Sequence, residues 1–345
     1  MIIGIYLIFY IGILGISFIG FSKRTNGKES LIDKKESNYI KGLATIMVFY
    51  AHMQAWISEM NISGMQGLKP FSVLGGMGVL LFFFVSGYGI HKGYAKKTPE
   101  ILFWKNRIIK MFIPATVISI VSCTVLYIEQ KKTIVDVLIN AIMGQWFVDV
   151  IMLEYMGFFI SWLFAKGNRK KIIIYDIIYS LIVAVFFIMM KFNARWYNGL
   201  LLFPAGMLIA EYEKIIIDKL NEMKKKDTIG ITAILLIAFA VTGAGFVLIK
   251  GSMFSNVVKT CSGILLSFLI CEILYFGKFG NKVANFIGER SLYIYLCHLW
   301  LWTIMQEKLV NVPILIEYPL LRIYLLIIGA LFYTEVMHLI FTRRL

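Results

Sequence analysis

Charged residues are scarce in this chain. Asp, Glu, Lys and Arg make up 16% of its 345 residues, whereas about 25% is usual in a soluble domain. Apolar residues make up 59% of the chain, and the mean hydropathy is +0.78. Because a water-soluble core cannot bury such an apolar excess, the composition excludes a soluble protein and predicts an integral membrane protein.

Cysteine and histidine are also rare. The four residues of each type form no cluster with metal-ligand spacing, so we expect no metal site. The cysteines have no paired spacing, which excludes a disulfide framework. They all fall inside apolar segments: Cys123, Cys261, Cys271 and Cys297.

Long polar segments are almost absent, and only residues 22–37 read as a polar linker. A helix needs about 20 apolar residues to cross a bilayer. The sequence offers eleven candidates: 2–21, 39–59, 73–91, 107–128, 145–165, 172–190, 195–212, 229–249, 256–277, 290–309 and 318–341. We therefore predict an all-α, polytopic membrane protein with 10–11 transmembrane helices. No basic region precedes segment 2–21, so we expect it to be retained rather than cleaved as a signal peptide.

The basic residues alternate between the loops. One set of alternate loops and the tail hold 24 Lys and Arg, and the opposite set holds 7. By the positive-inside rule the first set is cytoplasmic, which predicts an external N-terminus and a cytoplasmic C-terminus. The basic residues behind the net charge of +15 therefore set the topology and contact anionic lipid headgroups. We expect no nucleic-acid partner.

Two ionisable residues share one face of the segment 39–59. Lys41 lies near its predicted cytoplasmic end and His52 near mid-membrane. Eleven residues correspond to nearly three full helical turns and a rise of about 16 Å. His298 and Glu154 fall at a similar predicted depth. Ionisable groups at this depth indicate a reaction site or a proton path, although Lys41 alone also fits a snorkelling lysine and His52 a hydrogen-bonded core residue.

Further candidates lie on the third span and after it. Gly75 to Gly89 carries small residues suited to close helix packing, together with Ser86 and Tyr88. Arg107 and Lys110 follow on the cytoplasmic side and offer cations to a phosphate-bearing ligand. By themselves, these two charges also fit the positive-inside pattern.

These motifs, in this order, resemble those of the acyltransferase-3 family of multi-pass membrane acyltransferases. The family carries an arginine that is followed, after ten intervening residues, by a histidine. The segment "KGLATIMVFYAH" is similar to this motif, with Lys41 in the place of the arginine. Its later motifs resemble "GGMGVLLFFFVSGY" (75–88), "RIIKMFIP" (107–114) and "SLYIYLCH" (291–298). An acidic residue common in the second motif is replaced by Leu80. The resemblance divides the chain into an extra N-terminal helix with its linker, 1–38, and an acyltransferase-like domain, 39–345.

The resemblance implies an O-acyltransferase (EC 2.3.1.-, groups other than amino-acyl) of the plasma membrane. The donor would be a cytoplasmic acyl-CoA, chiefly acetyl-CoA, with no tightly bound cofactor. The acceptor would be a cell-surface glycan, its lipid-linked form or another envelope hydroxyl. Candidate donor-binding residues are Lys41, Ser86, Tyr88, Arg107 and Lys110, and candidate catalytic residues are His52, His298 and Glu154.

Several alternatives stay open at the level of sequence. Transfer can be direct, or can pass through an acyl-histidine. The same polar groups also fit an exporter or flippase of a polysaccharide, or a proton-coupled carrier that uses His52, His298 and Glu154. High Ile and Lys content indicates a bacterial, AT-rich genome. No sequence pattern specifies an acceptor or an oligomeric state.

Overall fold

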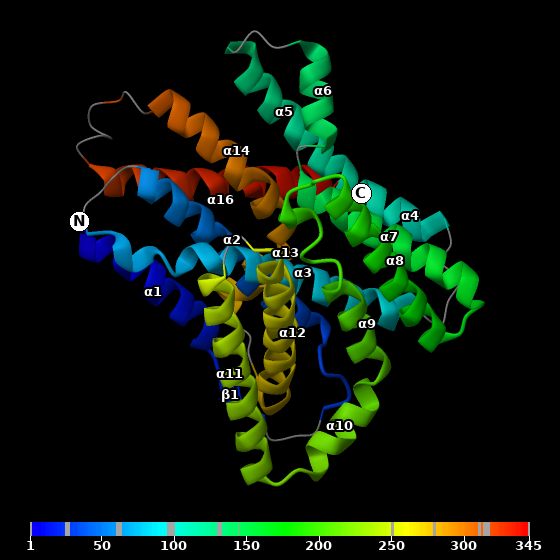
Figure 1. Ribbon diagram of the computed structural model, residues 1–345. Coiled ribbons are helices and arrows are strands. Elements are labelled where there is room, and N and C mark those ends of the chain that lie inside the picture. The colour runs from blue at the N-terminus through cyan, green and yellow to red at the C-terminus, as the bar shows by residue number, and fades with distance from the viewer. Residues whose placement is uncertain are drawn as a thin grey trace.

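The protein is almost entirely helical (Figure 1). The structure, a computed structural model, describes residues 2–24, 28–59, 64–94, 101–129, 133–143, 145–249, 252–278, 281–309, 312 and 318–343. The α-helices are α1 (Ile2–Phe18), α2 (Lys34–Glu59), α3 (Phe71–Tyr94), α4 (Ile101–Arg107), α5 (Ile113–Glu129), α6 (Ile134–Met143), α7 (Trp146–Ala165), α8 (Arg169–Met189), α9 (Leu202–Glu211), α10 (Glu213–Glu222), α11 (Lys225–Leu248), α12 (Met253–Phe276), α13 (Lys282–Glu289), α14 (Ser291–Leu309) and α16 (Pro319–Arg343).

Shorter elements connect these helices. Two 3₁₀ turns, η1 (Gln66–Leu68) and η3 (Ala194–Trp196), lie in loops, and the π-helical turn η2 (Ile108–Phe112) joins α4 to α5. The strands β1 (Ser22–Lys23) and β2 (Gly277–Lys278) form a two-residue antiparallel ladder.

The predicted class, an all-α polytopic membrane protein, is confirmed. Among the described residues, seven helices are long and apolar enough to cross a membrane. Large apolar side chains remain exposed on their outer surfaces, such as Ile182 (63%), Ile237 (64%) and Phe332 (71%). An apolar surface of this extent is unfavourable in water, and lipid chains cover it at no such cost.

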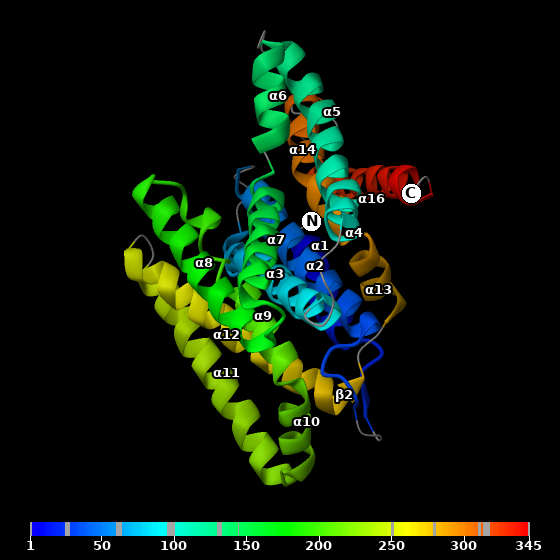
Figure 2. The same ribbon diagram turned by 90° about the vertical axis from the view of Figure 1, so that its right-hand side faces the viewer.

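Helices α2 and α3 lie at the centre of the molecule (Figures 1 and 2). Glycines let neighbouring backbones approach them closely. A Cβ on Gly87 of α3 would lie 1.9 Å from the Phe203 carbonyl oxygen of α9, and one on Gly288 of α13 would lie 1.8 Å from the Asn38 carbonyl oxygen of α2. Backbone contact of this kind fixes α9 and α13 against the central pair.

The start of α2 is set by a capping box. The Asp33 carboxylate accepts the Glu36 N–H at 2.8 Å, and the Glu36 carboxylate accepts the Asp33 N–H at 2.9 Å. Arg24 and Lys28 pair with the same Glu36 carboxylate at 2.5 and 2.7 Å. Burial lowers the pKa of Lys28, although its hydrogen bond to Glu36 opposes this. The box fixes the first turn of the helix that carries Lys41 and His52.

The predicted span 195–212 is wrong as a continuous helix. Helix α9 has only ten residues, and the segment before it is irregular apart from η3. Pro204 has no N–H for the carbonyl of Leu200, so an α-helix cannot continue back through this position. Arg169 pairs with Glu211 at 2.5 Å, which sets the end of α9 level with the start of α8.

The position of α9 has a consequence for the segment before it. Ten helical residues rise about 15 Å, roughly half of the hydrocarbon thickness. We therefore expect the irregular backbone before α9 to return into the membrane. Such backbone is tolerated at this depth only where protein buries it or where it lines a cavity.

Loops of the predicted cytoplasmic set gather at one end of the molecule. The β1–β2 ladder joins residues 22–23 to residues 277–278. Lys92 contacts Glu213 at 3.0 Å, and Arg169 contacts Glu211 at 2.5 Å. The loops that the sequence assigns to one side of the membrane therefore do lie together at one end of the molecule. Which side of the membrane this end faces stays a prediction.

The N-terminal helix packs directly on the predicted acyltransferase domain. The rings of Phe9 and Tyr50 lie 4.8 Å apart, and the Tyr50 hydroxyl donates to the Ile8 carbonyl at 2.7 Å. Helix α2 begins at Lys34 and runs through the predicted boundary at residue 38. The division into 1–38 and 39–345 stays a prediction.

Candidate active site

A cavity of about 430 Å³, called here the Lys41 cavity, collects four of the predicted donor-binding residues. These are Lys41, Ser86, Arg107 and Lys110. They come from α2, α3, α4 and η2, so the fold brings together residues from several separate motifs. No Asp or Glu lines this cavity within the described part of the chain. Its wall therefore carries three cations without a carboxylate among them.

A π-helical turn shapes one wall of the Lys41 cavity. Pro114 cannot donate to the carbonyl of Lys110, and the helix widens over Ile108–Phe112 just before it. Lys110 lies in this turn and lines the cavity. Such turns interrupt α-helices most often at functional sites.

Arg107 is held among aromatic rings. Its guanidinium carbon lies 4.3 Å from the ring centre of Phe103, 5.1 Å from that of Tyr94 and 5.3 Å from that of Tyr155. None of the ion pairs found among the described residues includes Arg107. Cation–π contacts orient the side chain and leave its charge available to an anion.

A neighbouring cavity of about 490 Å³ shares Lys41 and Lys110 with the Lys41 cavity. It also includes Asn38, Glu289 and Tyr293. Together, the two cavities give a space around Lys41 and Lys110 that is larger than a small acyl group requires.

His52 lines a second cavity of about 350 Å³, called here the His52 cavity. Trp146, Arg195, Asn198 and Lys259 also line it, with Gly75 and Gly76 of α3. Asn198 belongs to the irregular segment 190–201, so this re-entrant backbone forms part of the cavity wall. Irregular backbone that lines a cavity is of the kind that is tolerated within a membrane.

Tyr295 of α14 lines both the Lys41 cavity and the His52 cavity. Its ring packs 4.8 Å from Phe147 and 6.0 Å from His298, between centroids. The side chain is only 5% exposed. Tyr295 therefore lies between the Lys41 cavity, which has no histidine in its lining among the described residues, and the cavity lined by His52.

His298 lies behind His52 and lines neither cavity. The two imidazole rings are 5.2 Å apart between centroids. The Nδ1 of His298 lies 2.8 Å from the carbonyl of Ile294, so it donates its proton there in the neutral ring. The Nε2 is buried without a hydrogen-bond partner among the described atoms. His298 thus offers an unused acceptor beside His52.

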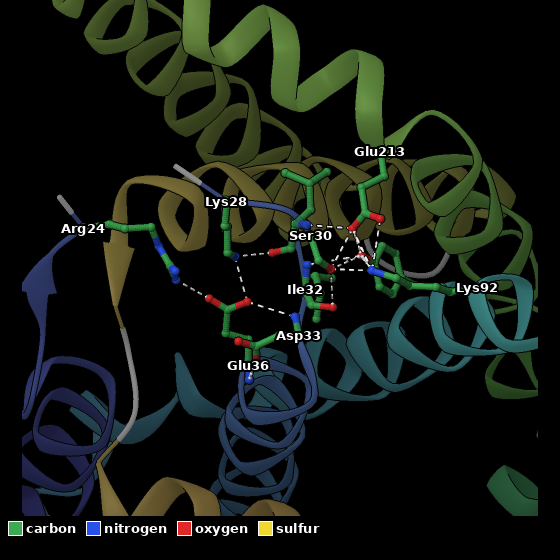
Figure 3. Close-up of polar contacts among 10 residues, drawn as sticks. Arg24, Lys28, Ser30, Ile32, Asp33, Glu36, Lys92 and Glu213 are labelled. Carbon is green, nitrogen blue, oxygen red and sulfur yellow. Dashed lines mark hydrogen bonds and ion pairs between the residues drawn. The ribbon is translucent and has the colours of Figure 1, made fainter. Parts of the chain in front are cut away.

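Tyr88 lies apart from both cavities. Its hydroxyl donates to the Glu213 carboxylate and accepts the N–H of Ile32 at 3.2 Å, and Lys92 and Ser30 complete the network (Figure 3). Burial alone would raise the pKa of Glu213, but hydrogen bonds from Tyr88 and Lys92 outweigh it and hold the pKa below its ordinary value. The structure therefore places Tyr88 where the linker before α2 is anchored.

Glu154 also lies away from the predicted site. It is buried between α7 and α8, where Ser180 donates to its carboxylate at 3.3 Å. Asp176 is buried beside it, and both Asp176 oxygens have no hydrogen-bond partner among the described atoms. Glu154 and His52 are thus not brought together.

Sequence reasoning did not single out Arg195, Asn198 and Lys259. Lys259 falls inside the predicted span 256–277, so an intramembrane lysine was a visible signal for a functional group. Arg195 is the first residue of the predicted span 195–212 and was counted as a loop charge, and Asn198 is an uncharged polar residue inside that span. Within the described residues, no group of three or more His, Cys, Asp or Glu could hold a metal ion.

Comparison with known proteins identifies the family of the chain. Residues 34–334 match the family model described as an acyltransferase domain, acyltransferase-3. No curated protein and no solved structure matched the chain. Because the family match covers nearly the whole chain, from the first turn of α2 into α16, the protein belongs to the acyltransferase-3 family of membrane proteins.

Proposed function

We propose that the protein is a plasma-membrane O-acyltransferase that moves an acyl group, acetyl in the simplest case, from cytoplasmic acyl-CoA to a hydroxyl of a cell-surface glycan. Family membership implies membrane acyl transfer. The observation that carries the finer proposal is the shared wall at Tyr295, with cations on one side and His52 on the other. This arrangement suits a donor and an acceptor that enter from opposite faces.

The donor binds in the Lys41 cavity. Lys41, Arg107 and Lys110 supply positive charge for the phosphates of CoA. Lys41 and His52 stand on one face of α2, about 16 Å apart along its axis. This separation is comparable with an extended pantetheine arm, so a CoA held by the cations can present its thioester past Tyr295.

His52 acts as the general base. As the acceptor hydroxyl oxygen attacks the thioester carbonyl, His52 takes the hydroxyl proton. The tetrahedral intermediate collapses, the carbon–sulfur bond breaks, and the sulfur leaves as a thiolate. The thiolate takes the proton held by His52, which returns the base to its neutral form. The products are an ester on the acceptor and free CoA.

His298 positions His52 in this scheme. In the reactive state that we propose, one ring N–H of His52 donates a hydrogen bond to the Nε2 of His298, which leaves the other His52 nitrogen unprotonated and able to act as the base. The buried, unpartnered Nε2 and the 5.2 Å separation of the two rings support this. Glu154 has no part in the reaction, since it lies between α7 and α8 with Ser180.

The purified full-length protein provides the test. We expect it to bind acetyl-CoA and to hydrolyse it slowly when no acceptor is present. An exporter or a proton-coupled carrier would do neither. In cells that lack the protein, an exporter predicts polymer retained inside, whereas the enzyme predicts exported polymer without acyl groups.

A further inference from the structure

The His52 cavity is positively charged. Arg195 from the loop before α9 and Lys259 from α12 both line it. Lys259 packs against α3, because a Cβ on Gly76 would lie 2.8 Å from its Nζ. A lysine within a membrane-spanning helix is costly and therefore indicates a functional group.

These two cations have no acidic counterpart in the cavity. No Asp or Glu lines the His52 cavity in the part of the chain that the structure describes. The ion pairs found there include neither Arg195 nor Lys259. Asp149, in the first turn of α7, is the nearby acid, since it and Arg195 both act electrostatically on Tyr295. Asp149 does not line the cavity and is a single carboxylate against the two cations Arg195 and Lys259. The cavity therefore has an excess of positive charge.

The positive surface continues beyond the His52 cavity. A cavity of about 570 Å³ shares Ser72, Gly76 and Lys259 with it and adds Lys69. Cations therefore follow one another from beside His52 through Lys259 to Lys69. A row of cations across two adjacent cavities suits an elongated ligand with repeated negative charges better than a single neutral sugar.

We propose that the acyl acceptor is an anionic, hydroxyl-bearing polymer. Its negative groups bind Lys259 and Arg195, and one of its hydroxyls is thereby placed against His52. Phosphodiester and carboxylate groups share this chemistry, and Arg195 can bind either of them bidentately. This inference rests on the proposed acyl transfer and specifies its acceptor.

The test uses the purified full-length protein, radiolabelled acetyl-CoA and three polymers. Poly(glycerol phosphate) and polygalacturonate represent the two anionic chemistries, and dextran is the neutral comparison. We expect transfer to one polyanion at a rate about tenfold or more above that to dextran. The polyanion to which the protein transfers acetyl groups shows whether it recognises phosphodiester or carboxylate groups. The preference weakens at high salt, because ions screen the attraction.

Variants locate the effect. Lys259→Gln and Arg195→Gln each remove one cation from the cavity and raise the KM for the polyanion about tenfold, with a smaller change in kcat. Lys191→Gln is the matched control, because Lys191 is an exposed lysine in the same region that lines neither cavity. It leaves both constants unchanged.

Failures of the two proposals are distinguishable. If the wild-type protein hydrolyses acetyl-CoA but transfers to neither polyanion better than to dextran, the anionic acceptor is overturned and the acyltransferase proposal stands. The same holds if both cation variants keep the wild-type KM. If the wild-type protein neither binds nor hydrolyses acetyl-CoA, the proposed function itself is overturned.

Discussion

The imidazole rings of His52 and His298 lie 5.2 Å apart between centroids, although the residues come from opposite ends of the chain. His52 lines a cavity, whereas His298 is 1% exposed and bound through Nδ1 to its own helix. In the mechanism that we propose, the two residues have different parts: His52 meets the substrate, and His298 orients the ring of His52.

Substitution of His298 separates these parts. We expect His298→Gln, which retains an acceptor, to keep more activity than His298→Phe, which loses about tenfold or more in kcat. The KM for acetyl-CoA stays close to wild type, because His298 lies outside the Lys41 cavity. Steady-state kinetics across a range of pH is the measurement. Equal loss in both variants, with an unchanged pH profile, would indicate a purely structural part for His298.

The cations of the Lys41 cavity are expected to hold the donor. Lys41→Gln and Lys110→Gln each raise the Kd for acetyl-CoA about tenfold, whereas Lys41→Arg retains binding. Lys105→Gln is the control, since Lys105 lies on α4 beside these residues but lines no described cavity. Isothermal titration with acetyl-CoA distinguishes them. Similar affinities in all four variants would contradict this donor site.

Tyr295 is expected to control access between the two cavities. Tyr295→Phe retains the ring and so retains the partition, whereas Tyr295→Ala joins the cavities. We expect the alanine variant to hydrolyse acetyl-CoA faster and to transfer less acetyl to an acceptor, because water reaches the thioester. The ratio of hydrolysis to transfer is the measurement. A ratio equal to wild type in Tyr295→Ala would show that Tyr295 is not a barrier.

Two glycines on α3 test the helix packing. A Cβ on Gly87 would lie 1.9 Å from the Phe203 carbonyl oxygen, whereas a Cβ on Gly89 meets nothing within 4 Å. Gly87→Ala is expected to destabilise the protein by about 2 kcal/mol. Gly89→Ala is expected to be neutral or to stabilise it by up to about 1 kcal/mol. Thermal unfolding in detergent compares the two, and equal midpoints would refute the α3–α9 backbone contact.

The linker network is expected to respond to pH. The pKa of Glu213 is lowered in the folded protein, so the stability that it contributes is present above its ordinary pKa. This contribution is lost as the pH falls through the lowered value. The Tm of wild type should therefore exceed that of Glu213→Gln at pH 7, and the two should converge in acid. A difference that persists in acid would show that the charge of Glu213 is unimportant.

Much of the fold could be predicted from sequence, because apolar length and loop charge report directly on membrane spans. The common face of Lys41 and His52 followed from helical periodicity, and both residues line cavities. The irregular segment before α9 was not predicted, because residues 195–212 were read as one continuous span although Arg195, Asn198 and Gly199 interrupt its apolar residues. The packing of Gly206 and Gly87 between α9 and α3, together with the Arg169–Glu211 ion pair, fixes the position of α9.

The placement of single polar residues was harder to predict. Depth along a helix suggested that Glu154 would join His52, but its face on α7 meets Asp176 and Ser180 instead. Tyr88 follows Ser86 by two residues, and that step turns it toward the linker rather than the Lys41 cavity. Rotation about a helix axis depends on tertiary packing, which a single sequence does not report.

The most direct test of the proposed transfer is the acetyl content of the exported surface polymer in cells that express His52→Ala. The variant must be present in the membrane at the wild-type level, which immunoblotting checks. We predict that the polymer is exported normally and lacks the acetyl groups that the wild-type protein adds. Acetylation equal to that with the wild-type protein would contradict His52 as the catalytic base.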